Sequence, residues 1–247
     1  MLSRVANKLG WKRRLRKPLA TLGTPVSRFI NQFKPRNAHS RTYLEIGVEH
    51  GYTFEAVIAS TKVAVDPNIR FSTWPKYSGI ELNSSPSDYY FAESHSQRIF
   101  DVIFIDGLHT AEQTWKDFCN SLVRVKDGGI IILDDTVPSD SFSAIPSEVE
   151  AYKQREQANV PNDFSWHGDV FRLIPHIAEI FPNLRYATVI DTPNPFTVFW
   201  NFAQSKENFL TNKSLPNLSF KEFFSEGMPD IYNSSSASQI LGKINAE

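Results

Sequence analysis

Short apolar runs alternate with polar, helix-like segments along the first 135 residues. The apolar runs are bounded by glycines and other turn residues and cover residues 43–46, 62–66, 79–83, 100–106 and 130–135. Runs of this length and setting are typical of buried β-strands. Helical patterns lie between them at residues 53–60, 87–91 and 110–123. The last of these begins with a capping box formed by Thr110 and Gln113. Strands separated by helical crossovers predict a parallel, doubly wound sheet.

Two further apolar runs, residues 184–190 and 195–200, are joined by a short proline-rich turn. Because so short a link cannot carry a parallel crossover, we expect the last strand to run antiparallel. The predicted fold class is therefore α/β, a doubly wound seven-stranded sheet that is mostly parallel and has an antiparallel last strand.

The remaining segments predict one domain, residues 42–200, with an extension at each end. Within the domain, residues 147–157 predict a charged helix, and residues 169–180 predict a helix interrupted at Pro175. Residues 201–247 lack a dense apolar pattern. Their phenylalanines at 220, 223 and 224 predict one short docking helix, and residues 234–238 predict a flexible stretch.

Composition adds one strong feature, a basic N-terminal extension. Residues 1–41 hold eleven Lys or Arg and no acid, which leaves 15 basic against 27 acidic residues in the rest of the 247-residue chain. The segment could dock beside the acidic domain, contact an anionic membrane surface or polyanion through residues 1–36, or act as an organellar presequence. No apolar stretch reaches the length of a membrane span. Cys119, the single cysteine, excludes an intramolecular disulfide, and we expect a buried thiol.

The first predicted strand ends in a glycine turn, Glu45-Ile46-Gly47-Val48-Glu49-His50-Gly51, followed by a helix. Glycines let a ligand approach the main chain closely, and the first N–H groups of a helix favour a carboxylate or phosphate. A dinucleotide site would need Gly-x-Gly-x-x-Gly. Here Glu49 stands at the middle glycine position, where a pyrophosphate would meet a negative charge. The spacing therefore argues against NAD.

The glycine turn resembles the first motif of class I S-adenosylmethionine-dependent methyltransferases. Two later segments, residues 100–109 with the pattern Phe-Asp-x-Ile-Phe-Ile-Asp-Gly-x-His and residues 126–135 with Lys-x-Gly-Gly-x-x-x-x-Asp-Asp, extend the resemblance. Together they are similar to a branch that includes sugar and natural-product O-methyltransferases. The resemblance covers residues 42–135 and continues more weakly to about residue 200.

This resemblance implies cofactor-binding positions at the carboxyl ends of the first three strands. Glu45 and the backbone from Gly47 to Gly51 would hold the methionine end of S-adenosylmethionine. Asp66 would accept both ribose hydroxyls, although an aspartate before Pro67 could also simply form a turn. Asn83 and Ser84 would lie near the adenine ring, where a plain helix cap is the alternative.

Three acids, Asp106, Asp134 and Asp135, end the fourth and fifth predicted strands. Carboxylates held together repel unless a cation or protons relieve them, and an oxygen-only set suits Mg²⁺ or Ca²⁺ rather than zinc. In metal-dependent members of the resembling branch, acids here hold a divalent cation that binds two substrate oxygens. The alternative is that Asp106 contacts the cofactor amine while Asp134 or Asp135 caps a loop.

His109 lies three residues beyond Asp106. A hydroxyl that attacks a sulfonium methyl group must lose its proton, and imidazole titrates near neutral pH, so His109 is the candidate general base. The alternative is a hydrogen-bonded loop residue. Residues 166–171 resemble a segment that recurs after the fifth strand in this branch. We expect them to line the acceptor pocket, although Trp166 could equally belong to the core.

The sequence thus predicts an S-adenosylmethionine-dependent O-methyltransferase that acts on a hydroxyl of a small molecule or sugar with a divalent cation. We expect a cytoplasmic protein, peripheral to a membrane if residues 1–36 bind one, with no specific nucleic acid partner; a homo-oligomer is left open. Two alternatives remain, a cofactor-binding relative of the hydroxylase type that transfers no methyl group, and an inactive scaffold tethered by the basic segment.

Overall fold

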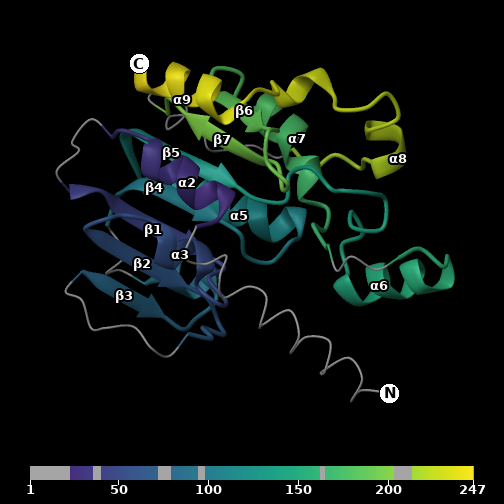
Figure 1. Ribbon diagram of the computed structural model, residues 1–247, viewed down its shortest axis with the longest axis horizontal. Helices are drawn as coiled ribbons and strands as arrows, with labels where there is room; N and C mark the ends of the chain where they lie inside the picture. The colour runs from purple at the N-terminus through teal and green to yellow at the C-terminus, as the bar shows by residue number, and fades with distance from the viewer. Residues whose placement is uncertain are drawn as a thin grey trace.

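The protein is built on one seven-stranded sheet. The computed structural model describes residues 23–35, 40–71, 79–93, 98–161, 165–202 and 213–246. The sheet has the order β3-β2-β1-β4-β5-β7-β6 (Figure 1). Its strands are β1 Thr42–Ile46, β2 Thr61–Val65, β3 Ile80–Asn83, β4 Phe100–Ile105, β5 Val125–Leu133, β6 Arg185–Val189 and β7 Phe196–Trp200. β7 pairs antiparallel with both β5 and β6, and the other pairs are parallel. The predicted fold class is confirmed.

Helices cover both faces of the sheet. One face packs against α4 (Ser87–Ala92), α5 (Ala111–Leu122) and α7 (Leu173–Ile180). The other packs against α2 (Pro25–Gln32), α3 (Tyr52–Ala56) and α9 (Ala237–Ala246). Figure 1 shows α6 at one end of the molecule, away from the sheet. The remaining elements are α6 Glu148–Gln157, η2 Val170–Arg172, α8 Phe220–Phe223 and η3 Asp230–Tyr232.

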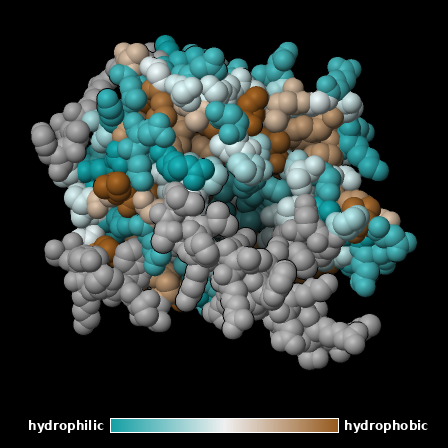
Figure 2. Space-filling model, viewed as in Figure 1, coloured by the Kyte–Doolittle hydropathy of each residue, from teal (hydrophilic) through white to brown (hydrophobic). Residues whose placement is uncertain are grey.

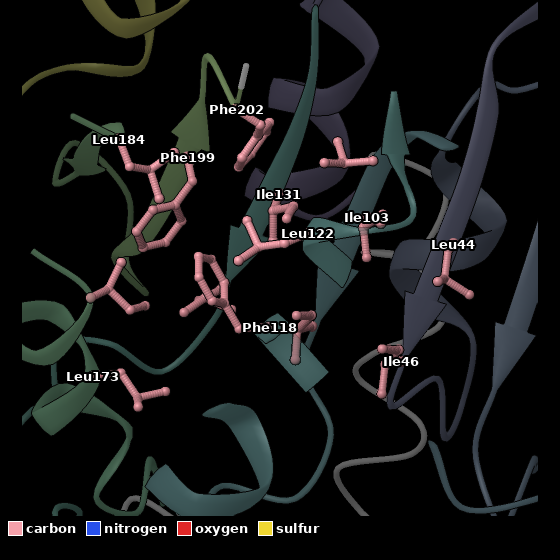
Figure 3. Close-up of a cluster of buried hydrophobic side chains, with 14 of the residues drawn as sticks. Leu44, Ile46, Ile103, Phe118, Leu122, Ile131, Leu173, Leu184, Phe199 and Phe202 are labelled. Atoms are coloured by element: carbon pink, nitrogen blue, oxygen red, sulfur yellow. The ribbon is translucent and has the colours of Figure 1, made fainter. Parts of the chain in front are cut away.

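Burial on both faces explains the continuous apolar runs of the central strands. All six residues of β4 are buried. Ile103 faces the layer of α5, where it joins Phe118 and Leu122 (Figure 3). Its neighbour Phe104 faces the layer of α2. A strand covered on both sides gains from apolar residues at every position, since successive side chains point to opposite faces.

Helix α3 is shorter than predicted. It ends at Ala56, although the sequence pattern extended it to residue 60. The Nζ of Lys62, which is 7% exposed, donates hydrogen bonds to the carbonyl oxygens of Phe54 at 2.7 Å and Val57 at 3.0 Å. A buried ammonium thus satisfies carbonyl groups at the helix end, and the chain turns directly into β2.

Pro175 does not interrupt α7, which was a wrong prediction. The helix begins at Leu173, so Pro175 is its third residue. Proline is tolerated in the first turn because the N–H groups there have no partner within the helix. The preceding residues form the short helix η2 instead of a continuous α-helix.

Residues 126–129, predicted as a turn, belong to an irregular start of β5. Gly128 has φ +76°, and the pairing register between β4 and β5 shifts between Phe100 and Val102. The strand ends at Leu133, so Asp134 and Asp135 lie just beyond it. The capping box of α5 is only half formed. Thr110 Oγ1 accepts from Gln113 N at 3.4 Å, but the Gln113 side chain points toward α4.

Elements from both predicted extensions contribute to the core. Phe29 and Ile30 of α2 and Ile240 of α9 are buried in the same cluster. Tyr232 is fully buried and donates to the carbonyl oxygen of Thr136 at 2.8 Å. Residues 234–238, predicted to be flexible, bridge to β6 through Ser235 and begin α9. The short helix predicted at residues 220–224 is confirmed as α8.

Most of the basic segment, residues 1–22, lies outside the described residues. Among the helices of the described chain, none combines the length and the apolar character needed to cross a bilayer.

Candidate active site

A cavity of about 1040 Å³ opens along the carboxyl ends of the parallel strands. Its walls come from the connections after β1, β2, β4, β5 and β6 together with residues of α2, α3, α4 and α5. The face shown in Figure 2 is hollowed near its centre, where hydrophilic side chains gather. Of the residues predicted for the site, Glu45, Gly47, Asp66, Asp106, His109 and Asp134 border this cavity. Gly51, Asn83, Ser84 and Asp135 do not border it directly.

Gly47 is required where β1 meets β4. Its φ is +85°, and a Cβ atom there would lie 1.8 Å from the carbonyl oxygen of Asp106. Gly51 has φ +72° and closes the turn by donating its N–H to the carbonyl oxygen of Val48 at 2.7 Å. The two glycines therefore have different tasks: Gly47 permits a close approach of two strand ends, and Gly51 shapes the turn that starts α3.

Asp66 holds this glycine turn in place. Its Oδ2 accepts the N–H of Glu49 at 2.8 Å, and its Oδ1 accepts the N–H of Asn68 at 2.6 Å. Glu49, which replaces a glycine of the resembling motif, has φ +37° and pairs with Arg70 at 3.1 Å. The carboxylate of Asp66 is 9% exposed. Each of its oxygens has a second lone pair for a ligand hydroxyl.

Glu45 is a buried acid at the end of β1. It is 2% exposed and accepts a hydrogen bond from the Tyr43 hydroxyl at 2.5 Å. Burial raises the pKa of Glu45 well above its usual value, against the opposing effects of Tyr43 and Lys62. A carboxyl group in this state favours a cationic ligand group beside it.

Asp106, His109 and Asp135 form a compact group of ligand atoms within 4.8 Å of one another. His109 Nε2 lies 3.0 Å from Asp135 Oδ2 and 3.5 Å from Asp106 Oδ1. Burial raises the pKa of Asp106 to about 6 against the effect of its hydrogen bond with His109. Burial opposes a charged imidazole, but Asp135 and Asp106 raise the pKa of His109 to about 10. In the free protein the imidazolium of His109 therefore offsets one of the two negative charges of this pair of acids.

The ring of His109 is fixed from the other side by the segment after α6. Its Nδ1 lies 2.9 Å from the carbonyl oxygen of Trp166, and the two rings stack with centroids 4.9 Å apart. Because a carbonyl only accepts, Nδ1 must carry a hydrogen, and Nε2 faces the acids. Gly168 makes this packing possible, since a Cβ there would lie 1.6 Å from the His109 carbonyl oxygen.

The structure adds Asn194, which the sequence did not single out, and it places His167, from the predicted acceptor segment 166–171, beside the acids. His167 Nε2 lies 3.8 Å from Asp135 Oδ1 and 3.1 Å from Asn194 Oδ1. Asn194 Nδ2 in turn donates to Asp134 Oδ1 at 3.0 Å. Asn194 comes from the turn between β6 and β7, whose antiparallel order was the only sequence signal that could have placed it at this edge. Burial and the nearby acids Asp106 and Asp135 raise the pKa of Asp134 well above its usual value.

The predicted adenine contacts are not at the cavity. Asn83 hydrogen-bonds to Ser85, and Ser84 is exposed. The cavity is instead bordered on this side by Ser87 and Asp88 at the start of α4, and by Gln113 and Asp117 on α5. In the sequence, Gln113 is expected only as part of the capping box of α5, and no pattern indicates Ser87, Asp88 or Asp117 as site residues.

The donor set at the β4 and β5 ends fits a divalent cation when His109 is neutral, because a protonated ring nitrogen cannot bind a metal. Two carboxylates and an imidazole nitrogen converge there, so the set contains nitrogen as well as the oxygens predicted from sequence. Asp134, the third predicted metal ligand, lies outside this group, and its Oδ1 is occupied by Asn194 and the backbone N–H of Asp135.

Residues 44–136 match the family model of a methyltransferase domain. No curated protein matches the chain. Among similar solved structures is the O-methyltransferase from Bacillus cereus in complex with S-adenosylhomocysteine, at 17% identity over 66% of this chain and 74% of that chain, with a TM-score of 0.42. TomG from Streptomyces achromogenes in complex with S-adenosylmethionine has 13% identity over 74% and 79%, with a TM-score of 0.42.

A third similar structure is MycE from the mycinamycin pathway in complex with Mg and S-adenosylhomocysteine, at 11% identity over 78% of this chain and 51% of that chain, with a TM-score of 0.45. The family match covers β1 to β5, the strands that carry the glycine turn and the acids described above. Residues 44–136 of this chain are therefore similar to a methyltransferase domain, and the similarity covers less than half of the 247 residues.

Proposed function

We propose that the protein transfers the methyl group of S-adenosylmethionine to a hydroxyl group of a small molecule or sugar. The observation that carries this proposal is a single cavity bordered by Asp66 after β2 and by Asp106 and His109 after β4. A ligand along this edge would have its sugar beside one carboxylate and its reactive carbon near an imidazole that can take up a proton.

The cofactor's charges suit the buried acids. Its ammonium group would lie near Glu45, whose burial without a full countercharge disfavours the ionised carboxylate in the free protein. Its ribose hydroxyls would donate to Asp66 through lone pairs that the Glu49 and Asn68 amides leave open. The glycine turn provides main-chain N–H groups for its carboxylate.

His109 is the proposed general base. The carbonyl of Trp166 holds the hydrogen on Nδ1, so Nε2 is the nitrogen that accepts the acceptor's proton. As the hydroxyl oxygen forms its bond to the methyl carbon, the bond from that carbon to sulfur breaks, and the hydroxyl proton moves to Nε2. Asp106 and Asp135 then stabilise the imidazolium. The positive sulfonium of the bound cofactor opposes protonation of His109 beforehand, which favours the neutral base in the complex.

A divalent cation belongs to the proposal as an assisting group. Asp106 and Asp135 would hold it, with Asp134 behind them, and it would supply a charge that orients the acceptor's oxygens. If EDTA leaves full activity and added Mg²⁺ restores nothing, the cation is removed from the mechanism.

The proposal is tested with purified protein, methyl-labelled S-adenosylmethionine and a panel of polyols, catechols and glycosides. We expect labelled product from at least one acceptor. The His109→Gln variant should lose turnover by about 100-fold, a typical effect of a general base, while its affinity for S-adenosylhomocysteine stays unchanged. Binding of S-adenosylhomocysteine without transfer to any acceptor would favour the non-methylating alternative, and no binding would favour the scaffold.

The basic segment is proposed to contact an anionic surface. Residues 1–41 carry eleven basic residues and no acid. Because residues 25–32 form part of the core as α2, the deletion that tests this proposal removes residues 1–22 only. Equal pelleting of both forms with vesicles rich in phosphatidylserine would contradict it.

A further inference from the structure

Four polar side chains gather where the cavity meets α4 and α5. Ser87 and Asp88 begin α4, and Gln113 and Asp117 lie one helical turn apart on α5. Asp117 is 1% exposed although it borders the cavity. None of these residues takes part in the methyl transfer described above, so their arrangement needs its own explanation.

The amide of Gln113 fixes the hydrogen bonding of this cluster. Its Nε2 lies 3.2 Å from Ser87 Oγ, 3.0 Å from Asp88 Oδ1 and 3.3 Å from Asp117 Oδ1. A nitrogen that faces three oxygens cannot be exchanged with the amide oxygen, so the orientation of the side chain is determined. Two hydrogens then serve three acceptors. The cluster therefore has acceptor capacity to spare.

The second oxygen of Asp117 lies beside the cavity wall at Gly107. A Cβ atom at Gly107, which borders the cavity, would be 3.9 Å from Asp117 Oδ2. Burial raises the pKa of Asp117 to about 6, against its hydrogen bonds with Ser87 and Gln113. At pH 8 the group is thus a buried carboxylate whose oxygen can accept a further hydrogen bond from a ligand.

The position of this cluster along the sheet edge indicates which part of a ligand it meets. Ser87 follows β3, whereas Asp135 and Asn194 lie at the β5 and β7 side. With the reactive carbon near His109 and the ribose at Asp66, the nucleobase would lie on the β3 side. Asn83 and Ser84, the residues first expected to contact it, do not border the cavity there. A purine amine has two N–H donors, and this end of the cavity offers acceptors.

We propose that Asp117 accepts a hydrogen bond from the exocyclic amine of adenine and makes the site specific for an amino-substituted purine. This inference rests on the proposed cofactor. The competing explanation is structural: Asp117 would do no more than link α5 to α4 through Gln113 and Ser87. The two explanations differ in what happens when the amine of the ligand is replaced.

The test compares S-adenosylhomocysteine with its deaminated counterpart, S-inosylhomocysteine, in which a carbonyl replaces the amine. Affinities for the wild type, Asp117→Asn and Glu112→Gln would be measured by calorimetry at pH 8. Glu112 is an exposed residue of the same helix, so its variant controls for the lost charge. Thermal unfolding would show that each variant is folded.

The wild type should bind S-adenosylhomocysteine at least about tenfold more tightly than the inosine analogue. The analogue lacks the amine that donates to the charged Asp117, and its carbonyl oxygen would face the Asp117 carboxylate, which is also an acceptor. Asp117→Asn should bring this ratio to about one or invert it, because its amide can donate to the carbonyl. Glu112→Gln should keep the wild-type ratio.

Equal wild-type affinity for the two nucleosides, or a ratio that persists in Asp117→Asn, would overturn the assignment and leave the proposed function intact. If neither nucleoside binds the wild type, the proposed cofactor fails and the assignment fails with it.

Discussion

Gly168 shows how a single missing Cβ atom positions a functional side chain. Its φ is +61°, and its backbone lies directly against the carbonyl of His109. The neighbouring Asp169 accepts the N–H of Ala111 at 2.7 Å, so the segment is hydrogen-bonded to the start of α5 as well as to the histidine ring. The location of the imidazole therefore depends on a residue 59 positions later in the chain.

Gly168→Ala is expected to lower the free energy of unfolding by about 2 kcal/mol or more, because the added carbon clashes with backbone at a left-handed position. Gly242→Ala is the matched control. Gly242 lies in α9, and a Cβ there has open space, so this variant should gain about 0.5 to 1 kcal/mol. Urea unfolding of the two variants measures the difference. Equal effects would contradict the close packing of Gly168 against His109.

Asp66→Ala is expected to weaken S-adenosylhomocysteine binding at least about tenfold, since a hydrogen bond to a charged group contributes about 1.5 to 3 kcal/mol. The variant also frees the amides of Glu49 and Asn68, so Asp66→Asn, which keeps one acceptor and the shape, should fall between it and the wild type. Calorimetry gives both affinities. Unchanged affinity in the alanine variant would remove Asp66 from the cofactor site.

The sequence placed the strand-end acids at one edge because carboxyl ends of neighbouring parallel strands meet there. Asp66, Asp106 and Asp134 are such cases. Asn194 and Asp117 could not be found in this way. Asn194 reaches the site through a hairpin turn whose course depends on the whole sheet, and Asp117 sits within a helix whose rotation is set by core packing.

At the scale of elements, regular amphipathic patterns predicted their elements well, and helix ends were the weak point. The polar residues at the start of α9 made the sequence pattern predict a flexible stretch there and no helix. Its serine-rich start looks flexible in sequence, yet Ser236 Oγ accepts the N–H of Gln239, and Gln239 Oε1 accepts from Ser235 and Ser236. Side chains that bond to nearby main chain favour such starts. In the sequence, only the apolar residues Ile240, Leu241 and Ile244 indicate this helix. They form one face of a helix of ten residues.

Ile240→Ala is expected to destabilise the protein by about 2 to 5 kcal/mol, because it leaves a cavity between α9, α2 and β6. Val149→Ala on α6 provides the control, since Val149 is 77% exposed and its loss should change stability by no more than about 0.5 kcal/mol. Thermal or urea unfolding would decide. A small effect at Ile240 would contradict the packing of α9 into the core.

At the scale of the whole molecule, buried acids make stability depend on pH. Burial raises the pKa of Asp117 from 3.8 to about 6, so the folded state binds this proton more tightly than the unfolded chain. The free energy of unfolding should therefore fall as the pH rises from about 4 to about 6, and this contribution should stay constant at higher pH. Asp106 acts in the same direction.

Asp117→Asn should make this part of the pH profile flatter, whereas Glu112→Gln should leave its slope unchanged. Urea unfolding of the free protein at several pH values across this range would measure the slopes. A steeper profile in Asp117→Asn than in the wild type would show that the carboxyl group is stabilised as an anion in the folded state.

The cavity has one wall from α2 and α3 and another from α4 and α5, which lie on opposite faces of the sheet. A nucleoside in it would contact both helical layers at once, so neither layer could separate without releasing the ligand. Amide hydrogens in α2 and in α5 should then become protected from exchange together when ligand is added. Occupancy would couple the two helical layers that pack on opposite faces of the sheet.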